Sequence, residues 1–148
     1  MNFNTFILKI YNVSFRLIGE ENKASDIATL AVDRVLTKFN CQETITDKML
    51  KICSMEVCYI FLTESNTICN IKDFTSQIDN KIENLVQASI LMLEPLNRVV
   101  IVWKDILGYE LIELNDIVKL QKKELNYLLF NSRKHLKDQL SKLKISQK

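Results

Sequence analysis

Glycine and proline are almost absent from this chain, whose 148 residues contain two glycines and one proline. Many-stranded sheets need turns built from these residues, whereas helices need few of them, so the composition predicts an all-α protein. The longest apolar run, Met49 to Leu62, is interrupted by two charged residues and is too short to cross a bilayer. The first 18 residues carry basic side chains within their apolar pattern, unlike a signal peptide. We therefore expect a cytoplasmic protein.

The residues that carry most enzyme chemistry are also scarce or badly spaced. The four cysteines stand at positions 41, 53, 58 and 69 without a Cys-x-x-Cys pair, and His135 is the single histidine. No zinc spacing or disulfide framework can be drawn from them, so reduced core thiols are expected. There is no glycine-rich phosphate loop and no His-Glu-x-x-His motif. The sequence predicts no enzyme, and we assign no catalytic residue, metal or cofactor.

The charge is unevenly distributed along the chain, although the net charge is only +2. Residues 1–118 hold 11 Lys and Arg against 16 Asp and Glu, whereas residues 119–148 hold 9 against 2. A basic excess of this size is typical of either a solvated helix face or a surface that contacts phosphates. The charge alone leaves both interpretations open.

Apolar residues recur every three or four positions in most of the sequence, which indicates amphipathic helices. Gly19 and Gly108 stand where helices end, Thr46 is placed to cap a helix, and Pro95 is placed in a first helical turn. Residues 49–62 are apolar on nearly every side, so a helix is expected there and a strand remains an alternative. We expect helices over 4–18, 22–39, 46–62, 78–93, 96–107, 110–118 and 122–144.

Residues 63–76 lose this periodicity and are rich in Ser, Thr, Asn and Asp. Such a composition is typical of a linker between two domains. The sequence therefore predicts two small helical domains, residues 1–62 and 77–148. The second has the order of elements of a helix-turn-helix with a basic final helix, which is the kind of motif that enters the major groove.

The second domain carries a run of residues that resembles the second DNA-binding region of bacterial sigma factors of the extracytoplasmic-function type. In that family a Leu-Pro opening is followed by an Arg, an apolar run, a basic-Asp pair, a Gly and a Glu-Ile-Ala segment. Here those places are held by Leu93, Arg98, Val99 to Trp103, Lys104, Asp105, Gly108, Glu113, Leu114 and Asn115. The register continues without a gap to Ser132, Arg133 and Leu136, which match the family's closing Ala-Arg-x-x-Leu helix.

The first domain extends the resemblance to about four fifths of the chain. Gly19, Ala24 and Asp26 match the Gly-Asp-x-x-x-Ala-x-Asp pattern of the family's polymerase-binding region, and residues 51–62 resemble the segment that opens the promoter. The resemblance implies a region 2-like domain that binds core RNA polymerase and a region 4-like domain that binds promoter DNA. We expect the polymerase contact on the polar face of the second helix, at Asp26, Thr29, Asp33 and Arg34.

Several positions that face DNA in the family differ here. The promoter-opening segment has Ser54, Met55, Tyr59 and Leu62 where polar residues are usual, and the turn glycine of the second domain is Lys119. In the recognition helix Asn126, Tyr127 and Leu128 replace a Lys-Ser-Arg run. A lysine-rich helix of this kind can bind the DNA backbone without choosing a sequence. We expect contacts of relaxed specificity from Lys119, Lys122, Lys123, Asn126, Tyr127, Arg133, Lys134 and Lys137.

Two functional hypotheses follow from the resemblance. The first is a sigma-like transcription initiation factor that binds core RNA polymerase and promoter DNA. The second is an interaction protein that keeps the sigma scaffold without promoter recognition, acting as a partner subunit, decoy or regulator of a sigma factor. An anti-sigma factor and a second sigma-like subunit are the further partners that the resemblance allows.

Overall fold

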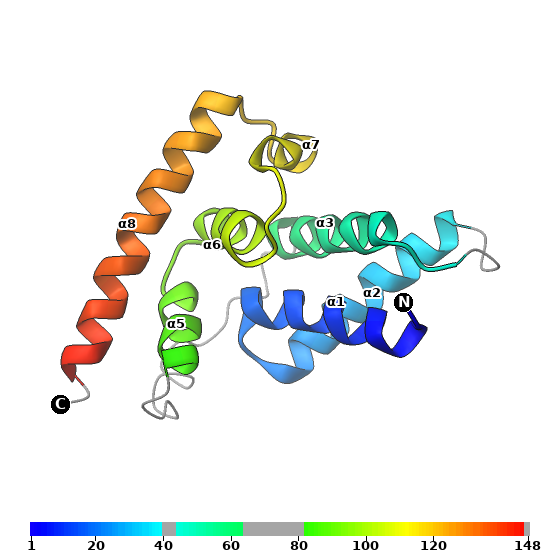
Figure 1. The fold of residues 1–148 in the computed structure, drawn as a ribbon, viewed down its shortest axis with the longest axis horizontal. Helices are drawn as coiled ribbons and strands as arrows, with labels where there is room; N and C mark the ends of the chain where they lie inside the picture. The colour runs from blue at the N-terminus through cyan, green and yellow to red at the C-terminus, as the bar shows by residue number, and fades with distance from the viewer. Residues whose placement is uncertain (40–43, 64–81, 147–148) are drawn as a thin grey trace. The chain divides into compact units, whose positions relative to one another are not determined.

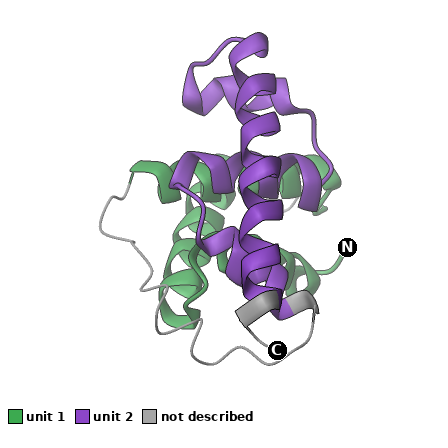
Figure 2. Ribbon diagram, turned by 90° about the vertical axis from the view of Figure 1, so that its left-hand side faces the viewer, with its two compact units in different colours: residues 1–68 green, residues 69–148 purple. Residues whose placement is uncertain are grey.

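The computed structural model describes residues 1–39, 44–63 and 82–146, and every regular element within these ranges is a helix (Figure 1). The prediction of an all-α protein is confirmed. The chain divides into two compact units, residues 1–68 and 69–148, coloured separately in Figure 2. Residues 64–76 of the predicted linker lie outside the described residues, so the linker stays a prediction. Within the described ranges, no helix is long and apolar enough to cross a membrane.

Unit 1 begins with helix α1, Phe3–Ile18, whose two ends are set by local side-chain chemistry. The side-chain oxygen of Asn2 accepts a hydrogen bond from the backbone N–H of Thr5 at 2.8 Å, which satisfies one of the free donors of the first turn. Gly19 ends the helix with φ 73°, a left-handed conformation that glycine adopts without steric cost. The C-terminal signal predicted from the sequence is therefore confirmed.

Helix α2, Glu21–Lys38, is capped by Glu20. The Glu20 carboxylate accepts hydrogen bonds from the backbone N–H groups of Asn22 and Lys23, each at 2.9 Å. Helix α2 begins at Glu21, so Asp26 lies beyond its first turn. The Ser14 hydroxyl of α1 donates a buried hydrogen bond to the Ala24 carbonyl at 2.8 Å, which joins the two helices.

Helix α3, Asp47–Thr63, completes unit 1 and settles the choice between helix and strand for residues 49–62. The Thr46 hydroxyl accepts a hydrogen bond from the backbone N–H of Met49 at 3.3 Å, as a capping residue should. The three helices pack against one another in all pairs. Their shared core is apolar and is filled by Phe6, Ile10, Leu17, Ile18, Ala31, Val35, Cys53, Val57 and Ile60.

Unit 2 begins, in the described residues, with α5, Ile82–Leu91, and α6, Pro95–Ile101. Residues 78–81 of the predicted first helix lie outside the described residues. Pro95 occupies the first turn of α6, as predicted, where its missing N–H costs nothing. The buried Arg98 is a structural residue, since its Nε donates a hydrogen bond to the Leu93 carbonyl at 2.8 Å.

The single regular helix expected over residues 96–107 was wrong. After Ile101 the chain widens into one π-helical turn, Val102–Ile106, in which the Leu107 N–H donates to the Val102 carbonyl five residues earlier. Both Val102 and Trp103 are buried in this turn. The Trp103 indole N–H donates to the Glu110 carbonyl at 2.9 Å, so the one polar atom of this buried side chain is satisfied.

Unit 2 ends in a 3₁₀ turn, Leu111–Leu114, the one-turn helix α7, Asn115–Val118, and the long helix α8, Lys122–Ser146. Helix α8 packs against α5, α6 and the 3₁₀ turn. Its buried side is a leucine stripe formed by Leu125, Leu129 and Leu143 together with Ser132. The opposite face of α8 is exposed along its length.

Candidate functional site

The predicted polymerase-binding residues of unit 1 lie on α2, and three of the four share one exposed face. Asp26, Thr29 and Asp33 are exposed and stand three and four residues apart, which places them in one row along the helix. Arg34 is different. Its guanidinium is directed to α3, where Nη1 donates to the Glu56 carboxylate at 3.1 Å. Arg34 is thus engaged in an ion pair within unit 1, and its part in a polymerase contact stays a prediction.

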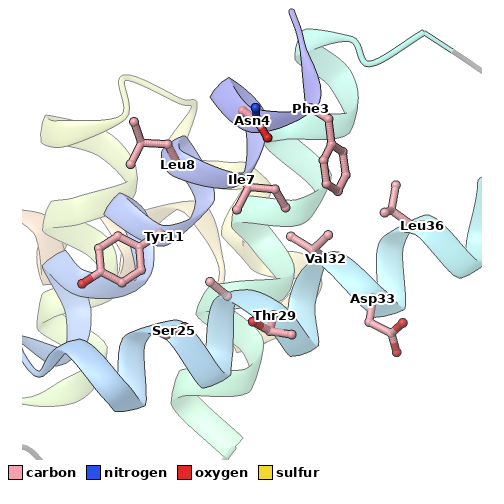
Figure 3. Close-up of a pocket in the computed structure, with 11 residues that line it drawn as sticks. Phe3, Asn4, Ile7, Leu8, Tyr11, Ser25, Thr29, Val32, Asp33 and Leu36 are labelled. Carbon is pink, nitrogen blue, oxygen red and sulfur yellow. The ribbon is translucent and has the colours of Figure 1, made fainter.

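An apolar groove of about 690 Å³ lies between α1 and α2 beside this row (Figure 3). The side chains of Phe3 and Ile7 extend from α1 toward those of Val32 and Leu36 on α2 (Figure 3). Two of its apolar residues remain open to solvent, since Phe3 is 50% exposed and Leu8 is 59% exposed. Thr29 and Asp33 also line the groove. The predicted polar row and the apolar groove therefore form one continuous surface.

The α1 side of this groove was missed by sequence reasoning, although a signal for it existed. The apolar residues of α1 are too numerous for one buried stripe. Phe6, Ile10 and Leu17 fill the core, whereas Phe3, Ile7, Leu8 and Tyr11 form a second apolar face. When a helix has two apolar faces, the second face is expected to make a contact in addition to the one that the first face makes with the core.

The α3 segment that resembles the promoter-opening region offers few polar groups to solvent. Ser54 is buried, and its hydroxyl donates to the Leu50 carbonyl at 2.8 Å. Met55 and Leu62 are half-buried, and Tyr59 is 42% exposed. Among the four substituted positions, Tyr59 alone presents an exposed side chain to a ligand.

In unit 2, Lys119 joins α7 to α8 in the left-handed conformation, with φ 56° and ψ 37°. Its N–H donates to the Asn115 carbonyl at 3.2 Å, which closes the end of α7. The resemblance places a glycine at this position, and a left-handed backbone is the conformation that glycine serves. Three residues later α8 begins, and the backbone N–H of Gln121 lies 3.4 Å from the Glu124 carboxylate, as in one half of a capping box.

All eight predicted DNA-binding residues are exposed on α8 or immediately before it. The exposed set comprises Lys119, Lys122, Lys123, Asn126, Tyr127, Arg133, Lys134 and Lys137. The structure adds one aromatic residue that sequence reasoning omitted, Phe130, which is 67% exposed. The sequence did indicate the exposure of Phe130, because this residue stands three residues after Tyr127 and outside the leucine stripe. Tyr127, at 69% exposed, borders an apolar depression of about 420 Å³ lined by Leu96, Leu120 and Leu128.

Arg133 is less available for phosphate than expected. Its Nε and Nη2 donate to the two carboxylate oxygens of Asp105 at 3.0 and 2.6 Å, in a two-bond pair that joins α8 to the π-helical turn. The hydrogen bond to Asp105 raises the pKa of the Arg133 guanidinium, because the carboxylate stabilises the charged form. The prediction that Arg133 contacts DNA was incomplete, since binding a phosphate requires this pair to open or be shared.

The two described cysteines, Cys53 and Cys58, are buried in α3 of unit 1. Burial raises the pKa of each thiol to about 12, because the low-dielectric core disfavours the thiolate. Cys41 and Cys69 lie outside the described residues. Among the described residues, no group of three or more His, Cys, Asp or Glu side chains is placed to hold a metal ion.

Comparison with known proteins gives no family for this chain. No protein-family model matches it, and no curated protein matches it with significance.

Proposed function

We propose that this chain is a sigma-like transcription factor, in which unit 1 binds core RNA polymerase and unit 2 binds promoter DNA with relaxed sequence specificity. The main support is the turn at Lys119. It adopts a left-handed backbone between a short helix and a long basic one, at the position where the resembled family has glycine. In helix-turn-helix motifs a turn of about three or four residues, which often contains glycine, joins the two helices, and the second helix enters the major groove.

Unit 1 supplies the surface that suits the polymerase. The row of Asp26, Thr29 and Asp33 borders an apolar groove, and a protein interface commonly combines an apolar centre with a polar rim. The test is co-elution of the purified chain with core RNA polymerase. We expect Asp26→Lys combined with Asp33→Lys to weaken this binding at least about tenfold, because charges at an interface are matched to the partner. Asp138→Lys, which makes half of this charge change on α8, should leave it unchanged.

Unit 2 supplies the surface that suits the DNA backbone. Binding to duplex DNA should be nearly indifferent to sequence and should weaken steeply as the salt concentration rises. In a plot of log affinity against log salt concentration, each neutralised phosphate contributes about 0.9 to the slope. Replacing Lys122 and Lys123 with Gln should lower the slope by roughly two. If Asn126 reads adenine instead, Asn126→Ala should cost about 1–3 kcal/mol on one preferred sequence and little on others.

A second function is favoured by the α3 surface, where Ser54 is buried and Tyr59 is the one exposed side chain among the four substituted positions. A chain that presents so few groups to unpaired bases suits a sigma-like interaction protein, which would act as a partner subunit, decoy or regulator of an active sigma factor. Run-off transcription from genomic fragments separates the two functions. An initiation factor yields transcripts with core polymerase alone, whereas an interaction protein yields none and changes the output of an added sigma factor.

A further inference from the structure

The exposed face of α8 carries two aromatic side chains in one row with three lysines. Lys123, Tyr127, Phe130, Lys134 and Lys137 follow one another at spacings of four, three, four and three residues, which places them on one side of a helix. All five are exposed. At a rise of 1.5 Å per residue this aromatic–lysine stripe is about 21 Å long. No residue of the stripe belongs to the core of unit 2.

The aromatic rings of the stripe are not needed for folding. Among the large apolar side chains of the described residues, Tyr127 and Phe130 are the two most exposed, at 69% and 67%. The core side of α8 is filled instead by Leu125, Leu129 and Leu143. Rings that are two thirds exposed contribute little buried apolar area to the unit itself. Rings placed between cations suit a ligand that offers both flat apolar faces and negative charge.

Unpaired nucleic acid has this combination of features, and duplex DNA does not. In a duplex the base faces are stacked on one another, and a protein reaches only the base edges, which are read by hydrogen bonds and by apolar contact with the thymine methyl group. A phenylalanine ring has no donor or acceptor, so at a base edge Phe130 is limited to that apolar contact. Unpaired bases expose their faces, and stacking on an aromatic side chain is sequence-tolerant because every base has such a face.

An amphipathic helix of an acidic partner protein fits the stripe less well. Such a helix needs a continuous apolar groove that takes anchors at spacings of three, four and seven residues. Here Lys123 and Lys134 interrupt the apolar surface on both sides of the two rings. The depression of about 420 Å³ beside the stripe is lined by Lys123 and Tyr127 and does not include Phe130.

We propose that the aromatic–lysine stripe binds single-stranded nucleic acid, with Tyr127 and Phe130 stacking on unpaired bases and the three lysines contacting phosphates. This inference rests on the nucleic-acid-binding part of the proposed function and names the ligand class of that surface. The lysines contribute affinity for every strand, because every strand carries phosphates. The rings add affinity only for strands whose bases are unpaired.

The experiment compares three labelled probes by fluorescence anisotropy with the full chain. The probes are an oligothymidine of about twelve nucleotides, an abasic strand of the same length, and a duplex of the same length. Oligothymidine should bind about tenfold more tightly than the abasic strand, since the two share their phosphates and differ only in bases. Tyr127→Leu and Phe130→Leu should each weaken oligothymidine binding several-fold relative to binding of the abasic strand by the same variant. Tyr127→Trp, which keeps a stacking ring, should retain binding.

Phe3→Leu is the matched control, because it removes an exposed ring from unit 1 and should change none of the three affinities. Circular dichroism checks that the variants fold. We expect them to fold, because both substituted rings are exposed. Equal affinity for oligothymidine and the abasic strand would overturn the stacking proposal while leaving duplex binding by unit 2 intact. Failure to bind any probe would reject nucleic-acid binding altogether. The proposal would also be overturned if the chain bound an acidic amphipathic peptide through the two rings and did not prefer oligothymidine to the abasic strand. The stripe would then be assigned to a protein partner.

Discussion

Lys119 holds a backbone conformation that costs a non-glycine residue about 1 kcal/mol. We expect Lys119→Gly to raise the free energy of unfolding of unit 2 by about 0.5 kcal/mol, because relief of this strain exceeds the added entropy of glycine in the unfolded chain. Lys134→Gly, inside α8, should lower it by about 1 kcal/mol. Chemical denaturation followed by circular dichroism measures both. If both substitutions changed the free energy of unfolding in the same direction, the left-handed conformation of Lys119 would be contradicted.

Cys53 and Cys58 give a second prediction at the scale of single residues. In a Cys41→Ser, Cys69→Ser variant only these two thiols can react, and we expect no labelling by a thiol reagent at neutral pH until the protein unfolds. The physical reason is burial, which keeps both thiols protonated up to a pKa of about 12.

The raised thiol pKa values also affect stability at high pH. Below the ordinary thiol pKa of 9.0, both folded and unfolded states are protonated and pH has no effect through these groups. Between pH 9.0 and about 12 the unfolded chain loses the protons first, so the free energy of unfolding falls as pH rises. Rapid labelling of the folded Cys41→Ser, Cys69→Ser variant at pH 9 would show that the thiols of Cys53 and Cys58 are accessible. The prediction that they do not react before unfolding would then be wrong.

At the scale of elements, the pair between Asp105 and Arg133 joins the π-helical turn to α8. Asp105→Asn should lower the free energy of unfolding by about 0.2–1 kcal/mol, as expected for a partly exposed ion pair. It should also release Arg133, and the slope of duplex-DNA affinity against salt should steepen by about 0.9. The control Asp138→Asn removes the same charge from the exposed surface of α8. An equal steepening with both variants would mean that net charge, and not Arg133, causes the effect.

At the scale of the whole molecule, the two units provide separate probes of unfolding. Trp103 is the single tryptophan of the chain and is buried in unit 2, whereas circular dichroism reports helices of both units. Leu17→Ala, in the core of unit 1, should lower the stability of that unit by about 3 kcal/mol. If the units unfold separately, the Trp103 fluorescence transition stays in place while an early circular-dichroism transition appears. A matched shift of both signals would show one cooperative molecule.

The sequence by itself determined where most helices of this protein begin and end, because those signals are local. Gly19, Thr46, Pro95 and Lys119 act on hydrogen bonds within three or four residues of themselves. The leucine stripe of α8 was likewise readable, since helical periodicity alone decides which residues share a face. The exposed cations of the candidate nucleic-acid surface follow from the same periodicity.

Only the tertiary structure decided which exposed charges are already paired and where grooves lie. Arg34 meets Glu56 across 22 residues of sequence, and Arg133 meets Asp105 across 28. The groove between α1 and α2 depends on how closely two helices approach, and the π-helical turn contains Trp103, which is buried with its N–H bonded to the Glu110 carbonyl seven residues away. Local patterns contain none of these distances, because the crossing of two helices is set by the packing of side chains that are distant in the sequence.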